Sequence, residues 1–266
     1  MSFIKLWFSL LLLHPVLSFS QHGGYMLQRS LPGIEAYGVD PDAFSFLTNR
    51  ASLASVEQPE CALFVVQRFM MNEFREYHGV GVWPTSLGNL GAAFHYSRFL
   101  NFSEQRFEFG YARALGTVEV GIGFAYFSEK ASGYRSLHGI NAAVAMRTRL
   151  GTRFTVGWQV MNFPGVQNKT PVHAIWVASL GLGYKASDDF LLAMEVTHEQ
   201  EEPINVHVGF CYNFHKSFFA KGGVHSDMSG WYGGAGWLHN KMRVLVTVSH
   251  HPFLGISPGV ALFQQL

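Results

Sequence analysis

The 266-residue chain carries few charges: 14% of its residues are Asp, Glu, Lys or Arg, against roughly 25% in soluble domains. Aromatic residues make up 15%, and the formal net charge of +1 offers no basic patch of the kind that holds nucleic acid. Beyond the N-terminus no apolar run approaches the length of a membrane-spanning helix. The composition therefore excludes a nucleic-acid-binding protein and a helical membrane protein.

The N-terminus has the parts of a secretory signal peptide. One Lys precedes a mainly apolar run at residues 6–13, and the SFS at residues 18–20 fits a small-residue cleavage site. A membrane-anchor helix is the alternative, but His14 and Pro15 end the run well short of the roughly 20 residues that a span needs. We expect residues 1–20 to be cleaved, which leaves about 245 residues for one large β-domain or two smaller ones.

The stretch DAFSFLTNRASLA, residues 42–54, is predicted to form a short helix. Asp42 is a favourable N-cap residue, and Phe44, Phe46 and Leu47 give the helix an apolar side. A helix this short is not stable alone in water. It must therefore dock on another part of the chain.

From about residue 60 the sequence divides into segments of roughly ten residues separated by turn residues. The pattern predicts about fourteen strands, with twelve or sixteen as alternatives. The predicted segments are 60–69, 74–83, 89–98, 104–114, 118–129, 136–149, 153–162, 173–185, 189–199, 203–214, 218–226, 230–238, 242–250 and 255–264.

Within these segments apolar residues alternate with small or polar ones. In VEVGIGFAYF, residues 118–127, the even positions are large and apolar, whereas the odd ones begin with Glu, Gly, Gly and Ala. The same division recurs in 138–147, 153–160, 190–199 and 204–214. Alternation with a period of two also describes a soluble β-sandwich or barrel. However, a face that meets water would carry many Lys, Glu, Arg and Thr, whereas small residues suit the interior of a modest barrel and large ones suit lipid.

The connections between segments form two sets. The tight set contains SLGN, ALGT, RLGT, KASDD, FHKS and HNK, which we expect on the periplasmic side together with both chain ends. The other set contains NEF, NFSE, EKASGYRS, NFPGVQNKTP, EQEEP, DMSG and HPFLGIS. These would be outer loops, and none is long enough to form a binding domain. The fold class is thus an all-β transmembrane antiparallel barrel of about 14 strands in the outer membrane of a Gram-negative bacterium.

The segment before the first strand carries a short motif. It consists of Asp42 and Ala43, followed by Asn49, Ala51, Leu53 and Ala54. This motif resembles the D-A and N-P-A-x-L-A signature of PorV/PorQ-like outer-membrane barrels, which are associated with type IX secretion and belong to the wider FadL-type superfamily. The resemblance extends through the strand spacing and the closing VTVSHHPFLGISPGVALFQQL, but Arg50 stands where the family usually has Pro. Because Arg does not interrupt a helix as Pro does, the helix is expected to continue through this position.

The resemblance implies a fourteen-strand barrel at residues 59–266, with residues 21–58 lodged in or beneath its lumen as a plug or latch. Strand parity places a set of ionisable side chains in that lumen. They either line a passage or form structural ion pairs in a closed interior. The set is Glu108, Glu119, Arg147, Lys185, Glu195, His207, Lys221, His225 and Arg243, with His95 on the same face.

No cofactor, metal or catalytic site is predicted. His250 and His251 are adjacent and would point to opposite faces of a strand, and no His or Cys cluster has zinc-ligand spacing. We therefore expect interfacial or exposed histidines. Ser–His neighbours such as Ser249 and His250 also point apart, and no G-x-S-x-G motif is present, so the chain is not expected to be an enzyme. The two cysteines, Cys61 and Cys211, lie in separate predicted strands and are expected to stay unpaired.

Two functions remain. The first is a secretion-associated scaffold with a closed lumen, whose rim binds a protein of the secretion machinery. The second is a FadL-like channel that moves hydrophobic small molecules across the outer membrane. Short outer loops and the family resemblance favour the scaffold. Either barrel would be surrounded by outer-membrane lipid.

Overall fold

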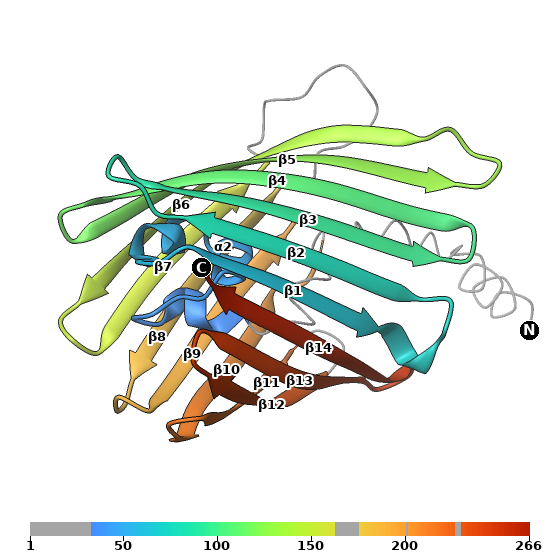
Figure 1. Ribbon diagram of the computed structural model, residues 1–266. Coiled ribbons are helices and arrows are strands. Elements are labelled where there is room, and N and C mark those ends of the chain that lie inside the picture. Colours follow the sequence, from blue (N-terminus) through green and yellow to red (C-terminus); the bar gives the residue numbers. More distant parts are fainter. Residues whose placement is uncertain (1–32, 163–175, 201, 227–229) are drawn as a thin grey trace, which may run out of the picture.

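The computed structural model describes residues 33–162, 176–200, 202–226 and 230–266. In these residues fourteen antiparallel strands form a closed barrel, in which each strand pairs with its neighbours in sequence and β1 pairs with β14 (Figure 1). The strands are β1 (Glu60–Gln67), β2 (Arg75–Trp83), β3 (Asn89–Phe99), β4 (Phe102–Leu115), β5 (Val118–Ala131), β6 (Leu137–Leu150), β7 (Phe154–Met161), β8 (Val177–Lys185), β9 (Phe190–Glu199), β10 (Asn205–His215), β11 (Phe218–His225), β12 (Trp231–His239), β13 (Met242–His251) and β14 (Gly255–Gln265). The predicted all-β antiparallel barrel of 14 strands is confirmed.

The observed strand ends lie close to the predicted ones, except that β8 begins at Val177. The predicted signal peptide and most of the NFPGVQNKTP loop lie outside the described residues. Within the described part of the chain, no helix is long and apolar enough to cross a membrane.

The two faces of the wall follow the alternation in the sequence. Along β5, Glu119 and Ala125 are buried, whereas Ile122 and Phe124 are 45% and 57% exposed on the outside. Because successive side chains of a strand point to opposite faces, this alternation makes the outer face of β5 apolar and its inner face small or polar.

The tight connections lie at the end of the barrel where β1 begins and β14 ends, here called the proximal end; the other end is distal. Gly116 and Gly151 in two of these turns have φ of 67° and 69°. This left-handed conformation costs glycine little because glycine lacks Cβ. It explains the repeated LG turns of the sequence.

The chain before β1 lies inside the barrel at the proximal end (Figure 1). This luminal segment, residues 33–56, contains the 3₁₀ turn η2 (Gly33–Tyr37), the helix α2 (Ser45–Thr48) and the 3₁₀ helix η3 (Arg50–Ser55). Phe44 packs edge-to-face on Phe64 of β1 and Phe263 of β14, with ring centroids 6.4 and 5.4 Å apart. This apolar cluster also contains Phe46, Leu53, Val82, Phe219 and Leu245.

The prediction of one helix over residues 42–54 is wrong. The helix α2 has four residues, and Asn49 is extended, with φ −143° and ψ 115°. The Gln159 side chain on β7 explains the break, because it donates to the Thr48 carbonyl oxygen and accepts from the Arg50 N–H, at 3.1 and 3.0 Å. The wall thus binds backbone groups that a continuous helix would pair internally. Asp42 caps the turn before α2 instead, since its Oδ1 accepts from the Ser45 N–H at 3.0 Å.

Candidate functional site

The candidate site is the contact surface between the luminal segment and the inner wall. Ala43, Ser45, Asn49, Ala51 and Leu53 are all completely buried, or nearly so. In the described residues the segment contacts the wall mainly at β3 to β10 through the backbones of η2 and η3. Polar and charged side chains of the wall hold it at several places around the lumen.

The first anchor is Arg50, the residue that departs from the family motif. Its guanidinium forms a buried ion pair with Glu108 of β4 and donates to the Leu47 carbonyl oxygen at 2.8 Å. Arg106, two residues from Glu108 on the same strand, pairs with the same carboxylate at 2.7 Å. A proline here would remove both the ion pair and the N–H that Gln159 binds. Arg50 therefore joins the luminal segment to β4 and β7.

The second anchor is Arg147 on β6, whose side chain is completely buried. It pairs with Glu119 of β5 and donates to the carbonyl oxygens of Ala36 and Gly38, at 2.8 and 3.3 Å. It also donates to Ser55 Oγ at 2.6 Å. One wall side chain thus binds both ends of the luminal segment.

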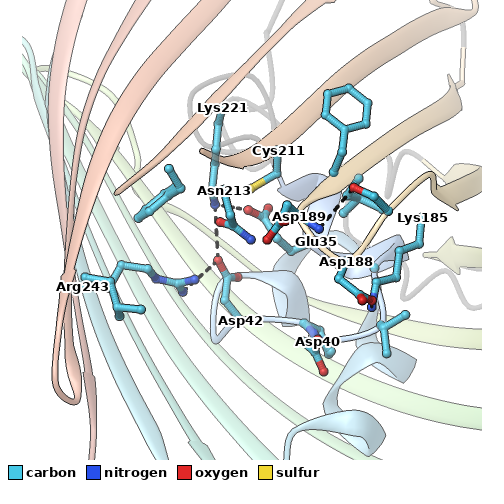
Figure 2. Close-up of a pocket in the computed structure, with 18 of the residues that line it drawn as sticks. Glu35, Asp40, Asp42, Lys185, Asp188, Asp189, Cys211, Asn213, Lys221 and Arg243 are labelled. Atoms are coloured by element: carbon cyan, nitrogen blue, oxygen red, sulfur yellow. Dashed lines mark hydrogen bonds and ion pairs between the residues drawn. The ribbon is translucent and has the colours of Figure 1, made fainter. Parts of the chain in front are cut away.

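The third anchor is an ion cluster on the opposite wall. Lys221 of β11 pairs with Glu35 and lies 3.6 Å from Asp42, and Arg243 of β13 lies 3.2 Å from Asp42 (Figure 2). Glu60 of β1 accepts from the Ala43 N–H at 2.8 Å. Burial alone would raise the pKa of Asp42, but Lys221 and Arg243 hold that pKa below its usual value. Asp42 is therefore a charged link between the segment and two strands.

Two further anchors are hydrogen bonds donated by the uncharged side chains of Tyr37 and Asn89. The Tyr37 hydroxyl donates to Glu195 of β9 at 2.6 Å. Burial and the neighbouring Glu195 raise the pKa of Tyr37 well above its usual value, so the hydroxyl stays a donor. Asn89 of β3 donates to the carbonyl oxygens of Leu53 and Val56, at 2.6 and 2.7 Å.

Glycines of the inner wall make room for the segment. A Cβ on Gly121 would lie 2.5 Å from the carbonyl carbon of Arg50, and one on Gly183 would lie 2.0 Å from the Tyr37 carbonyl oxygen. Both clashes are with backbone atoms, which cannot rotate away. The small residues of the inner face are therefore needed where the luminal segment touches the wall.

Towards the distal end the lumen is lined by polar side chains. Arg68 binds Glu76 with two hydrogen bonds of 2.7 and 2.8 Å. His78 and His95 lie with their Nδ1 atoms 2.8 Å apart. On the other side His207 Nε2 is 2.7 Å from the Tyr232 hydroxyl. The interior is thus charged and hydrogen-bonded beyond the luminal segment too.

The structure places the predicted lumen residues in three groups. Glu108, Glu119, Arg147, Glu195, His207 and Lys221 are buried inside the barrel. His225 is half-buried and stacks on His207, with ring centroids 4.3 Å apart. Lys185 and Arg243 lie nearer the proximal mouth, where Lys185 pairs with Asp188 at 2.8 Å.

Several anchoring residues were not predicted, namely Glu35, Tyr37, Arg50, Glu60, Asn89 and Gln159. Asn89 and Gln159 are polar residues at inward-facing strand positions, so their parity could have identified them. Glu35 and Tyr37 precede the predicted helix, where no periodic pattern marks them.

The expectation of interfacial or exposed histidines is wrong for part of the set. His78, His95 and His207 are each less than a tenth exposed, because aromatic stacking and hydrogen bonds pair them across neighbouring strands. Among the described residues no group of three or more His, Cys, Asp or Glu side chains is arranged to hold a metal ion. Cys61 and Cys211 are both free thiols.

The fold is similar to that of known outer-membrane barrels. The deltaS2S3 mutant of the TodX monoaromatic hydrocarbon channel has 10% sequence identity and a TM-score of 0.69, covering 90% of this chain and 98% of that one. The toluene transporter TodX of Pseudomonas putida has 9% identity and a TM-score of 0.63, covering 87% and 95%. No protein-family model and no curated protein sequence matches the chain. The likeness is one of fold.

Proposed function

We propose that this chain is an outer-membrane barrel channel whose lumen is closed at rest by the luminal segment, which acts as a plug. The outer face supports a membrane location. Leu63, Phe109 and Ile140 are 61%, 64% and 75% exposed there, among many other large apolar residues. A continuous apolar band of this kind is unfavourable in water and suits the hydrocarbon core of a bilayer.

The observation that carries the proposal is the anchoring of residues 33–56 to wall strands all around the lumen. Two buried ion pairs cross the contact, Arg50 with Glu108 of β4 and Glu35 with Lys221 of β11. Arg147 of β6 holds the segment on a third side, by hydrogen bonds to the carbonyl oxygens of Ala36 and Gly38. Breaking a buried pair leaves an uncompensated charge, which is costly. The plug therefore holds the lumen closed, and opening requires it to move.

The cargo that we propose is a small hydrophobic molecule, as in a FadL-like channel. Structures with a similar fold include a monoaromatic hydrocarbon channel and a toluene transporter, which favours this cargo over the scaffold role that the sequence favours. The proximal end, which carries the tight turns, would face the periplasm.

Planar-bilayer recording tests this function. The full chain should conduct ions little, whereas a variant lacking residues 22–54 should show a steady conductance, because the charged inner wall would then surround a water-filled pore. Heat-modifiable migration on a denaturing gel checks that the shortened chain still forms a barrel. If both chains are folded and neither conducts ions, the plugged channel is refuted.

The second candidate is a PorV/PorQ-like partner barrel that assists secretion. It is favoured by the motif residues Asp42, Asn49 and Leu53, which are all buried against the wall as a permanent plug would require. In that case the lumen stays closed, and the rim and short loops bind a protein of the secretion machinery. This candidate predicts that neither the full chain nor the variant lacking residues 22–54 conducts ions in the bilayer experiment.

A further inference from the structure

A cavity of about 370 Å³ opens at the proximal mouth between the plug and the wall formed by β8 to β14 and β1 (Figure 2). The plug contributes Glu35 and the stretch from Gly38 to Asp42 to its lining. The wall contributes apolar side chains and charged ones. The wall residues of this cavity that carry the argument are Glu60, Leu191, Asn213, Phe219, Lys221, Leu238 and Arg243.

The charges around the cavity do not balance. Its lining holds six carboxylates and four cationic side chains, which leaves two negative charges in excess. The imbalance extends to the inner part, where, among the described residues, three carboxylates face two cationic side chains. The carboxylates are Glu35, Asp42 and Glu60, and the cations are Lys221 and Arg243. Since an uncompensated buried charge is costly, this inner cluster favours uptake of one positive charge.

Glu35 is the carboxylate with the poorest coordination. Its side chain is 9% exposed, and one oxygen pairs with Lys221. The other oxygen, Oε2, has no hydrogen-bond donor among the described residues. Burial raises the pKa of Glu35 and the Lys221 charge only partly opposes this. A buried carboxylate oxygen beside a cavity and without a donor is a ready acceptor for a ligand N–H.

The rest of the cavity suits an apolar group. Leu191, Phe219 and Leu238 contribute apolar side chains to the lining beside the charged residues. Of these, Phe219 is 5% exposed and belongs to the apolar cluster around Phe44. A ligand that fits both features has a cationic head and a small apolar body.

From these observations we propose that the cavity is a binding site for a small organic amine, whose ammonium group donates to Glu35 Oε2 and whose apolar body lies against Leu191 and Leu238. The ammonium group supplies the positive charge that the inner cluster lacks. The inference goes beyond the channel function, because it needs only the closed barrel. A barrel that conducts can fail to bind the amine, and a silent barrel can bind it.

Isothermal titration calorimetry on the detergent-solubilised full chain tests the site, with benzylamine as the probe. Benzyl alcohol has nearly the same shape without the charge and should bind at least about tenfold more weakly, because a charge-assisted hydrogen bond is lost. Glu35→Gln should weaken benzylamine binding by about tenfold or more for the same reason. Glu57→Gln is the matched control, because Glu57 is exposed and lies outside the cavity lining, and it should leave binding unchanged.

A second variant covers the case in which Glu35→Gln does not fold. Asn213 is an exposed residue in the cavity lining, so the large side chain of Asn213→Trp should block entry to the cavity. It should also weaken benzylamine binding by about tenfold or more. The site is refuted if benzylamine binding does not saturate, if benzyl alcohol binds equally well, or if Glu35→Gln or Asn213→Trp binds benzylamine as the unchanged chain does.

Discussion

Replacing Arg147 with alanine should release the plug while the barrel stays folded. The change leaves the buried Glu119 without its closest partner and removes donors to Ala36, Gly38 and Ser55. Removing one partner of a buried ion pair typically costs about 3–5 kcal/mol. The barrel strands keep their ladder hydrogen bonds, so the cost should fall mainly on plug docking.

Arg50 provides the readout, because it is the one trypsin-sensitive residue between positions 33 and 56 and is only 3% exposed. Cleavage after Arg50 tracks the undocked population when opening is faster than cutting. Arg147→Ala should therefore accelerate this cleavage about a hundredfold or more. The double variant Arg147→Met with Glu119→Gln should recover part of the protection, since no buried charge is then left unpaired.

Arg149→Ala is the matched control for this experiment. Arg149 also donates to Ser55 Oγ, at 2.8 Å, but its side chain is 43% exposed. Exposed ion pairs contribute about 0–1 kcal/mol, so cleavage should change little. If Arg147→Ala were cut as slowly as the unchanged chain, Arg147 would not hold the plug.

Adding a single methyl group at Gly183 should also loosen the plug. In Gly183→Ala the new Cβ would lie 2.0 Å from the Tyr37 carbonyl oxygen and 2.8 Å from its carbon. Because these are backbone atoms, the plug itself must shift. Overpacking of this kind costs about 1–3 kcal/mol, which corresponds to cleavage after Arg50 that is about tenfold to a hundredfold faster.

Gly233→Ala is the control for the added methyl group. At Gly233 the nearest heavy atom to a new Cβ is the Lys221 carbonyl oxygen, 3.9 Å away, an ordinary van der Waals contact. Trypsin sensitivity at Arg50 should therefore not change. Equal protection in Gly183→Ala and Gly233→Ala would show that the plug does not press against β8.

The barrel could be predicted because period-two alternation is a local property of each strand. Once one face of a strand must meet lipid, the register of that strand is determined. The same parity correctly separates inward Glu119 from outward Val120. The turn positions could be predicted from glycines such as Gly116, because a tight turn often needs the left-handed conformation that this residue takes.

The contacts of the plug could not be predicted, because they join residues far apart in sequence. Nothing near Arg50 in the sequence indicates that Glu108 and Gln159 will bind it, so the sequence alone marks Arg50 only as a departure from the motif. The break of the predicted helix at Asn49 has the same origin, since the Gln159 side chain binds backbone groups on both sides of it. Local helix propensity was overridden by tertiary hydrogen bonds.

The inward charges were expected to pair with one another or to line a passage. Arg147 does pair with Glu119, but several of the inward charges also bind the plug, as Arg147 binds the carbonyl oxygen of Ala36 and Lys221 binds Glu35. Strand parity determines which way a side chain points, but not what fills the lumen. The cavity beside Glu35 could therefore not be predicted from the sequence either.

Chemical labelling of a buried plug residue tests the central claim most directly. Ser52 is completely buried in the plug, and Ser52→Cys changes only one atom. In a chain with Cys61 and Cys211 replaced by alanine, this cysteine should resist a membrane-impermeant maleimide, whereas Glu57→Cys, at an exposed position five residues later, should react quickly. Adding Arg147→Ala should make Cys at position 52 reactive. Rapid labelling of Ser52→Cys in the otherwise unchanged barrel would contradict a docked plug.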